Sequence, residues 1–294
     1  MKHYLGIDIG GTSIKSGIVS EEGALLSQQK IPAPPDWESM LAAIEQLYRE
    51  GTEEVGAIEG IGLATPGISN PHTGIISGIV AQSVNYILGK CFFDLSDMLG
   101  VPVSLEQDAN SAALGEYWVG NAAHTSSCVV LVLGTGLGGS ILFDGRVHHG
   151  AHIFGGDIGY AYRTHRLDVH SFSWNIAPVY VEMQYKQRTG QFLTIPQMFE
   201  ARLTDPEAAD IYDNFIGSLA NAVYLMQYII DPEVVLIGGG ISDWDLLIPE
   251  TERRLAELKG LRESPLLPQV RRCKFGNSAN ILGAVYNLKQ MKKI

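Results

Sequence analysis

The first residues that could do chemistry lie near the start of the chain, where Asp8 precedes Gly10, Gly11, Thr12 and Lys15. Glycines allow backbone N–H groups to close around phosphate oxygens. A nearby carboxylate can hold the Mg²⁺ that accompanies phosphates, usually through water. We therefore expect these five residues to form a phosphate site, with Asp8 holding Mg²⁺ through water. An ordinary tight turn is the alternative explanation for Gly-Gly-Thr.

Two further glycine clusters each follow an apolar run. They are Gly134, Thr135, Gly136 and Gly138, and Gly238, Gly239 and Gly240. The density of glycine in the first cluster costs backbone entropy, which favours an anion-binding turn over a plain one. The triplet lies at the carboxyl end of an expected strand, where α/β sheets commonly bind ligands. A simple strand-to-helix turn remains the alternative for the triplet.

Asp108 is the strongest candidate for a catalytic group. It follows an expected strand over 101–105 and precedes an expected helix over 110–119. With an ordinary pKa of about 3.9, an aspartate is ionised at neutral pH and can accept the proton of a hydroxyl group. A structural alternative is that Asp108 caps the helix, a position that Asp favours.

The elements that must position these residues alternate between strand and helix. Two apolar strands, each followed by a glycine-rich turn and a second strand, begin at residues 4 and 129, which predicts two related halves. The other expected elements are helices over 37–50 and 211–230 and strands over 58–64 and 234–237. This alternation predicts an α/β protein. We expect lobes over 1–120 and 121–280, with a helix over 281–294 returning to the first lobe.

The composition limits the classes of partner. The 294 residues carry a formal net charge of −11, which opposes nucleic acid or an anionic membrane as the main partner. Residues 1–20 fit neither a signal peptide nor a membrane span, so the cytoplasm is the expected compartment. The three cysteines are too widely spaced for a disulfide framework or a Cys-x-x-Cys metal site.

Taken in order, the motifs resemble the ROK family of bacterial sugar kinases. The matching segments are Asp8–Lys15, Glu106–Glu116, Gly134–Gly139, Gly150–Gly159 and Ile237–Gly240. The resemblance extends over residues 4–285 and implies a two-lobed, actin-like ATPase (ribonuclease H-like) fold, with ATP and sugar meeting in the interlobe cleft. It also implies that Asp108 is the catalytic base, that ATP and Mg²⁺ are required, and that the protein forms a homodimer.

The same resemblance implies which residues contact the sugar. They are Gly67, Asn85, Gln107, Asp108, Asp157 and Tyr160. Three of them depart from the family pattern: Gln107 replaces Asn, Asp157 replaces Glu, and Tyr160 replaces His. Turn residues that satisfy only their own backbone are the alternative for Gly67 and Asn85.

The departure at Tyr160 removes a residue that normally binds zinc in the family, and the associated cysteine motif is missing from 161–181. We therefore expect no zinc site. Histidines at 148, 149, 152, 165 and 170 could form an unrelated metal site, but solvated or hydrogen-bonded loop histidines explain them better. Members without zinc include β-glucoside and hexose kinases.

The predicted function is transfer of the γ-phosphoryl group of ATP to a hexose or β-glucoside, a small-molecule partner. N-acetylmannosamine, glucose and allose are alternative acceptors. A transcriptional regulator of the same family is disfavoured because the phosphate motif begins at Tyr4, without a preceding helix-turn-helix. An inactive sugar sensor stays open because Asp157 and Tyr160 depart from the pattern.

Overall fold

The computed structural model describes residues 2–161 and 171–291. The chain forms two compact units. The first contains residues 1–124, 145–155 and 277–294, and the second contains residues 125–144 and 156–276. The chain therefore leaves the first unit after residue 124, returns to it for a short segment at 145–155, and ends in it.

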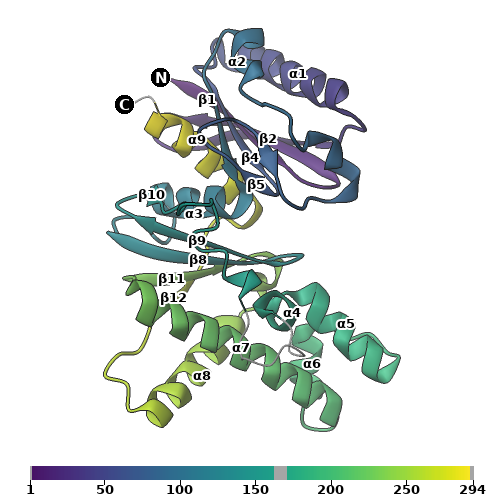
Figure 1. Ribbon diagram of the computed structural model, residues 1–294, viewed down its shortest axis with the longest axis vertical. Coiled ribbons are helices and arrows are strands. Elements are labelled where there is room, and N and C mark those ends of the chain that lie inside the picture. Colours follow the sequence, from purple (N-terminus) through teal and green to yellow (C-terminus); the bar gives the residue numbers. More distant parts are fainter. Residues whose placement is uncertain (1, 162–170, 292–294) are drawn as a thin grey trace. The chain divides into compact units, whose positions relative to one another are not determined.

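The first unit contains a five-stranded sheet with the order β3-β2-β1-β4-β7 (Figure 1). Its strands are β1 His3–Ile9, β2 Ser13–Ser20, β3 Leu25–Pro32, β4 Ile61–Thr65 and β7 Val103–Gln107. Strands β1 to β3 are antiparallel, whereas β1, β4 and β7 run parallel. Parallel pairing aligns Asp8 with Ala64, and Ala64 with Glu106. With strands about 4.8 Å apart, Asp8 and Glu106 lie in one row about 10 Å apart.

Within the described residues, the first unit also contains helices and several short elements. They are α1 Trp37–Val55, α2 Asp94–Leu99, α3 Asp108–Val119, α9 Ala279–Met291, η1 Gln82–Ile87, and the two-stranded sheet of β5 Ile68–Ser69 and β6 Ile76–Ser77. The η4 turn, Gly276–Ser278, begins at the last residue of the second unit. Helix α1 begins where the Asp36 carboxylate accepts the Ser39 N–H at 2.8 Å, and ends at Gly56, whose φ is +85°. The helix predicted over 37–50 is thus confirmed and extends five residues further.

Alternating side chains of β1 place helices on both faces of this sheet. Leu5, Ile7 and Ile9 belong to the apolar core that also holds Met40 and Ile44 of α1. Gly6 points the other way, where an added Cβ would lie 2.5 Å from the carbonyl oxygen of Ile281 in α9. Helices α1 and α9 therefore cover opposite faces (Figure 1).

Helix α9 packs unusually close to its neighbours. A Cβ at Gly62 would lie 2.2 Å from the carbonyl oxygen of Ala284, and a Cβ at Gly283 would overlap the carbonyl oxygen of Ser111 in α3. Only glycine permits this approach at either position. The close contacts fix α9 against β4 and α3, beside the strands that carry the predicted phosphate site.

The second unit contains sheet strands in the order β9-β8-β11-β12. They are β8 Ser127–Leu133, β9 Leu137–Phe143, β11 Val234–Gly238 and β12 Val270–Arg272. The short strand β10, Arg146–Val147, belongs to the 145–155 segment of the first unit. Strands β8 and β9 form a hairpin, and β8, β11 and β12 run parallel. This repeats the β1, β2, β4 and β7 arrangement, so the prediction of two related α/β halves is confirmed.

Helices cover one face of the second sheet. They are α4 Phe172–Ile176, α5 Pro178–Thr189, α6 Ile195–Ala201, α7 Pro206–Ile230 and α8 Leu247–Arg262, with the short turns η2 Ile158–Tyr160 and η3 Gly240–Asp243. Helix α7 begins five residues earlier than predicted because the Asp205 carboxylate accepts the N–H groups of Glu207 and Ala208. Its apolar side packs with Leu131 and Val235 in one core.

Among the residues that the structure describes, none of the helices is long and apolar enough to span a membrane.

Candidate functional site

Asp8 lies at the centre of a three-residue contact in the first unit. The hairpin register places it opposite Lys15, whose Nζ lies 3.5 Å from Oδ2 of Asp8. The amide of Asn280, in the first turn of α9, donates to Oδ1 of Asp8 at 3.0 Å. Burial raises the pKa of Asp8 above its ordinary value, and this effect outweighs the lowering by Asn280 and Lys15. The strand and turn pattern in the sequence predicts a carboxylate near the end of β1. Its amide partner, Asn280, is evident only from the tertiary structure.

The first glycine turn, residues 10–12, is held at both ends. The Gly10 N–H donates to the carbonyl oxygen of Ser13 at 2.9 Å, which closes the hairpin. The Ser83 hydroxyl donates to the carbonyl oxygen of Gly11, and a Cβ at Gly11 would lie 2.8 Å from that of Ala81. The η1 turn, which carries the candidate sugar ligand Asn85, therefore packs directly on the candidate phosphate turn.

Asp108 is the first residue of α3, and Gln107 is the last residue of β7. Both side chains are partly exposed. The Ala109 N–H donates to Oδ1 of Asp108 at 2.7 Å, while the N-cap position itself belongs to Gln107. The alternative that Asp108 is the N-cap is therefore wrong, because the N-cap is the preceding residue, Gln107. The predicted strand-to-helix junction is observed, with α3 beginning two residues before its expected start.

Gly67 lies in a tight turn after β4. Its φ is +83°, and a Cβ there would lie 2.8 Å from Cγ1 of Val80 and 2.9 Å from the carbonyl oxygen of Ser77. The hydroxyl groups of Thr65 and Ser69 are 2.6 Å apart and buried. The turn is thus fixed by backbone geometry and by an internal hydrogen bond.

The glycine cluster after β8 is shorter as a turn than the sequence indicates. Strand β9 begins at Leu137, so Gly138 lies in the strand opposite Val132. The turn itself is residues 134–136, which are exposed and closed by a hydrogen bond of 3.0 Å from the Gly134 N–H to the carbonyl oxygen of Gly136. Exposed backbone of this kind can receive a ligand.

The Gly238–Gly240 segment meets this turn within the second unit. Gly238 ends β11, Gly239 has a φ of +94°, and Gly240 begins the η3 turn. A Cβ at Gly239 would lie 2.1 Å from the carbonyl oxygen of Leu133, the residue immediately before the 134–136 turn. Two predicted phosphate elements, about 100 residues apart in sequence, are therefore neighbours.

Asp157 precedes the η2 turn and Tyr160 is its last residue, also in the second unit. Asp157 is half-buried, whereas Tyr160 is 64% exposed. Between them, Gly159 packs so tightly that a Cβ would lie 2.1 Å from the carbonyl oxygen of Leu137. The Ser173 hydroxyl accepts the Leu137 N–H at 3.0 Å. The segment with both candidate sugar ligands is therefore fixed to the start of β9.

The part of the chain that the structure describes contains no group of three or more His, Cys, Asp or Glu side chains placed to hold a metal ion. His165 and His170 lie outside the described residues. Asp8 offers Mg²⁺ one carboxylate, already bonded to Asn280 and near Lys15. This fits an ion bound mainly by water and phosphate oxygens, as Mg²⁺ prefers, and not a site built of protein ligands alone.

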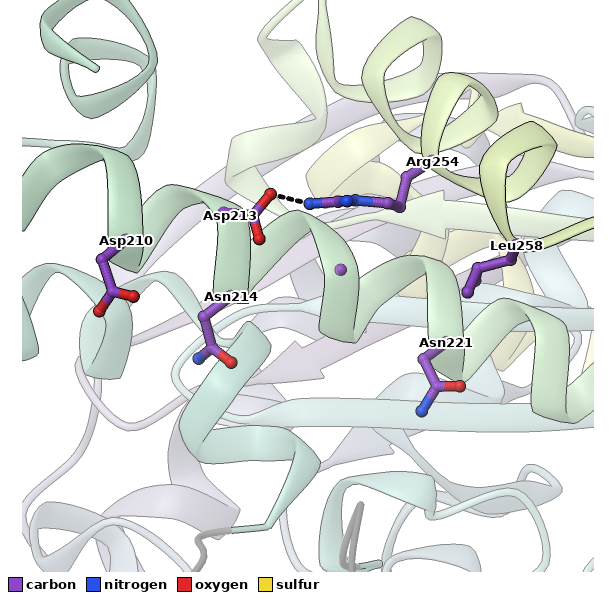
Figure 2. A pocket seen from close by; sticks show the side chains of 7 residues that line it. Asp210, Asp213, Asn214, Asn221, Arg254 and Leu258 are labelled. Atoms are coloured by element: carbon purple, nitrogen blue, oxygen red, sulfur yellow. Dashed lines mark hydrogen bonds and ion pairs between the residues drawn. The ribbon is translucent and has the colours of Figure 1, made fainter. Parts of the chain in front are cut away.

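A hollow of about 410 Å³ lies between α7 and α8 (Figure 2). Its lining residues are Asp210, Asp213, Asn214, Gly217, Asn221, Arg254 and Leu258. None of them is a predicted site residue, and its charges are already matched. Asp213 forms an ion pair with Arg254, and Oδ2 of Asp210 lies 2.6 Å from Nη1 of Arg188. The ion pairs of the lining residues thus give no indication of a charged ligand in this hollow.

Four residues of the site have no specific role predicted from the sequence: Asn280, Ser83, Glu106 and His149. Glu106 lies in a segment that matches the family pattern, and His149 directly precedes another such segment. A hydrogen-bonded loop histidine is one of the alternatives that the sequence offers for His149. His149 has this role, since its Nε2 lies 2.8 Å from Oε2 of Glu106. Asn280 had no signal beyond being polar at the start of an apolar helix.

Comparisons with known proteins match almost the entire chain. The family model described as ROK family matches residues 4–170 and 175–291. The chain is 29% identical over 306 residues to an N-acetyl-D-glucosamine kinase of Haemophilus influenzae, covering 96% of this chain and 97% of that protein. It is 30% identical over 294 residues to a β-glucoside kinase of Listeria innocua, covering 96% of each.

A crystal structure of a ROK family protein from Streptococcus pneumoniae in complex with sucrose is similar throughout. Its TM-score is 0.89 at 27% identity, over 99% of both chains. The expected actin-like ATPase fold is thereby confirmed. The chain belongs to the ROK family.

Proposed function

We propose that this protein is a cytoplasmic, ATP- and Mg²⁺-dependent sugar kinase that phosphorylates a hydroxyl group of a hexose or β-glucoside. The proposal rests mainly on the row formed by Asp8 and Glu106. Both residues lie near the carboxyl ends of the parallel strands β1 and β7, and Asp108 follows directly after β7. Similarity to sugar kinases over at least 96% of the chain supports the same conclusion.

In this mechanism Asp108 is the general base. Its carboxylate accepts the proton of the sugar hydroxyl as that oxygen attacks the γ-phosphorus, and the bond between the γ-phosphorus and the β,γ-bridging oxygen breaks to release ADP. The Ala109 N–H donates to one oxygen of this carboxylate at 2.7 Å, which restrains the Asp108 side chain. Protonated Asp108 then returns its proton to water.

Phosphate binding is assigned to backbone groups and two charged side chains. The exposed turn at 134–136, Gly239 and Gly240 are open to ATP oxygens, as are Gly10, Gly11 and Thr12. Lys15 adds a positive charge beside Asp8. Asp8 would hold Mg²⁺ through water, and the ion would neutralise charge on the transferring phosphoryl group.

The acceptor class follows from Gln107, Asp157 and Tyr160, which we propose as sugar contacts with Asn85 and Gly67. A longer amide at Gln107 and a shorter carboxylate at Asp157 change which hydroxyl groups can be paired. The two curated relatives act on N-acetylglucosamine and on β-glucosides, by their names. The missing cysteine motif favours the β-glucoside class here, with N-acetylmannosamine, glucose and allose as alternatives.

The deciding experiment is a coupled ADP-release assay with Mg-ATP and a panel of sugars. The panel contains cellobiose and other β-glucosides, glucose, allose, N-acetylmannosamine and N-acetylglucosamine. We expect turnover with one class, and turnover lower by about a hundredfold or more for Asp108→Asn. Sugar binding in calorimetry without phosphorylation of any panel member would instead support a sensor. Light scattering of the same sample tests the proposed homodimer.

A further inference from the structure

Glu106 connects three separate segments of the first unit through one buried carboxylate. The side chain has no exposed surface. Its Oε1 accepts the Gln107 N–H and the Asn110 amide N–H, both at 2.9 Å. Its Oε2 lies 2.8 Å from Nε2 of His149, and because a carboxylate only accepts, the ring nitrogen donates. The end of β7, the first turn of α3 and the 145–155 segment thus share one anchor.

The two donors to Oε1 lie on either side of Asp108. Gln107 is held by its backbone and Asn110 by its side chain, so the chain at 107–110 cannot shift without breaking a bond to Glu106. The direction of the Asp108 side chain depends on this backbone, because the neighbouring Ala109 N–H binds its carboxylate. Any change at Glu106 therefore reaches the proposed base.

His149 is itself held in place by its backbone. The Gly155 N–H donates to the carbonyl oxygen of His149 at 2.9 Å, which closes the loop between them. A Cβ at Gly155 would lie 1.9 Å from the carbonyl oxygen of His148, so no other residue fits there. The backbone that carries the imidazole is therefore restrained by a hydrogen-bonded loop.

The environment of His149 favours its contact with Glu106. Burial by itself lowers the pKa of His149, but the hydrogen bond and the negative charge of Glu106 outweigh it and raise the pKa above its ordinary value. A buried carboxylate that lacks hydrogen-bond donors is costly, so the contact with His149 offsets part of the cost of burying Glu106.

We infer that His149 and Glu106 are positioning residues that hold Asp108 and Gln107 in the orientation required for phosphoryl transfer. The inference rests on the proposed function. A displacement of about 1 Å at a reacting group can lower a rate by about a hundredfold.

The test compares three substitutions in the full chain. His149→Gln keeps an amide nitrogen near the place of Nε2, His149→Asn has an amide one methylene too short, and His149→Ala has no donor. We expect kcat to fall about 30-fold or more in His149→Ala and His149→Asn, with KM for ATP and sugar within about threefold of wild type. His149→Gln should recover to within about fivefold. His152→Ala, an exposed change in the same loop, is the matched control.

Hydrogen exchange of the backbone amides at 107–110 gives a readout that does not need activity. Exchange should quicken in His149→Ala and His149→Asn and return to normal in His149→Gln. Should the alanine variant not fold, the Gln and Asn pair decides the question. Wild-type kcat in His149→Asn, or a loss not recovered by Gln, overturns the positioning role and leaves the kinase assignment intact. Wild-type protein inactive on every sugar overturns the kinase proposal instead, while exchange still reports whether the pair holds the junction.

Discussion

The side-chain amide of Asn280 donates a hydrogen bond of 3.0 Å to the carboxylate of Asp8, although 272 residues separate them. Asp8 is the penultimate residue of β1, and Asn280 is the second residue of α9. The close packing of α9 against β4, which requires Gly62, holds the amide where it meets the carboxylate. Asp8, the proposed Mg²⁺ ligand, is therefore oriented by Lys15 near the start of the chain and by Asn280 near its end.

Asn280→Ala should weaken binding of Mg-ATP. A hydrogen bond to a charged group contributes about 1.5 kcal/mol, so the apparent affinity should fall about tenfold, with kcat at saturating Mg-ATP much less affected. The measurement is the dependence of the rate on Mg-ATP concentration. Asn287→Ala is the matched control, because Asn287 is on the same helix but donates to the carbonyl oxygen of Leu105. Equal losses in the two variants would contradict a specific role for Asn280.

Asp8→Asn should abolish activity without loss of stability. The folded-state pKa of Asp8 is raised, so the ionised carboxylate disfavours the folded state. That cost is absent at pH values below the unfolded pKa of about 3.9 and develops fully as pH rises through the folded pKa. The melting temperature of Asp8→Asn relative to wild type should therefore rise across that range and then level off. Calorimetry between pH 4 and 7.5 checks this, and a difference that falls with pH would contradict it.

Asp108→Asn should lower kcat by about a hundredfold or more, because the amide cannot take the proton. Binding of ATP and sugar should stay within about tenfold, since the amide oxygen can still accept the Ala109 N–H. Steady-state kinetics and calorimetric binding measure the two effects. Asp94→Asn is the matched control, as Asp94 is also the first residue of a helix, α2, and is exposed. A variant that keeps more than a tenth of kcat would remove Asp108 from the role of base.

Purified protein should contain no stoichiometric zinc. The family's cysteine motif is missing from 161–181, and Tyr160 stands where a histidine ligand is expected. Treatment with EDTA should stop activity only until Mg²⁺ is restored. Metal analysis by mass spectrometry provides the check, and one zinc per chain would refute the prediction.

ATP hydrolysis without sugar should be at least about a hundredfold slower than sugar phosphorylation, a difference of about 2.7 kcal/mol in barrier. The proposed phosphate turns at 10–12 and 134–136 belong to different units, so we expect the accepted sugar to favour the arrangement in which both engage ATP. ADP release with and without sugar measures the ratio, and small-angle scattering should show a smaller radius of gyration with sugar. Equal hydrolysis in both conditions would exclude this gating.

Several features of the site were predictable because they depend on residues close together in sequence. Asp8 and Lys15 face each other because a three-residue turn joins two paired strands, which fixes their register. The position of Asp108 at a strand-to-helix junction was predictable because an apolar strand pattern precedes it and a helical pattern follows it. The glycine turns follow from the same local pattern, although Gly138 belongs to a strand because pairing with Val132 extends the hairpin.

The tertiary structure alone decided which distant groups complete the site. Asn280 meets Asp8 only because α9 packs on β1 and β4, and His149 meets Glu106 only because the chain returns to the first unit at 145–155. Likewise, Gly239 approaches Leu133 only because β11 pairs beside β8. Residue periodicity and turn chemistry act over a few positions and so can be read directly. Contacts between residues far apart in the chain depend on which surfaces pack together, and no local pattern in the sequence specifies that choice.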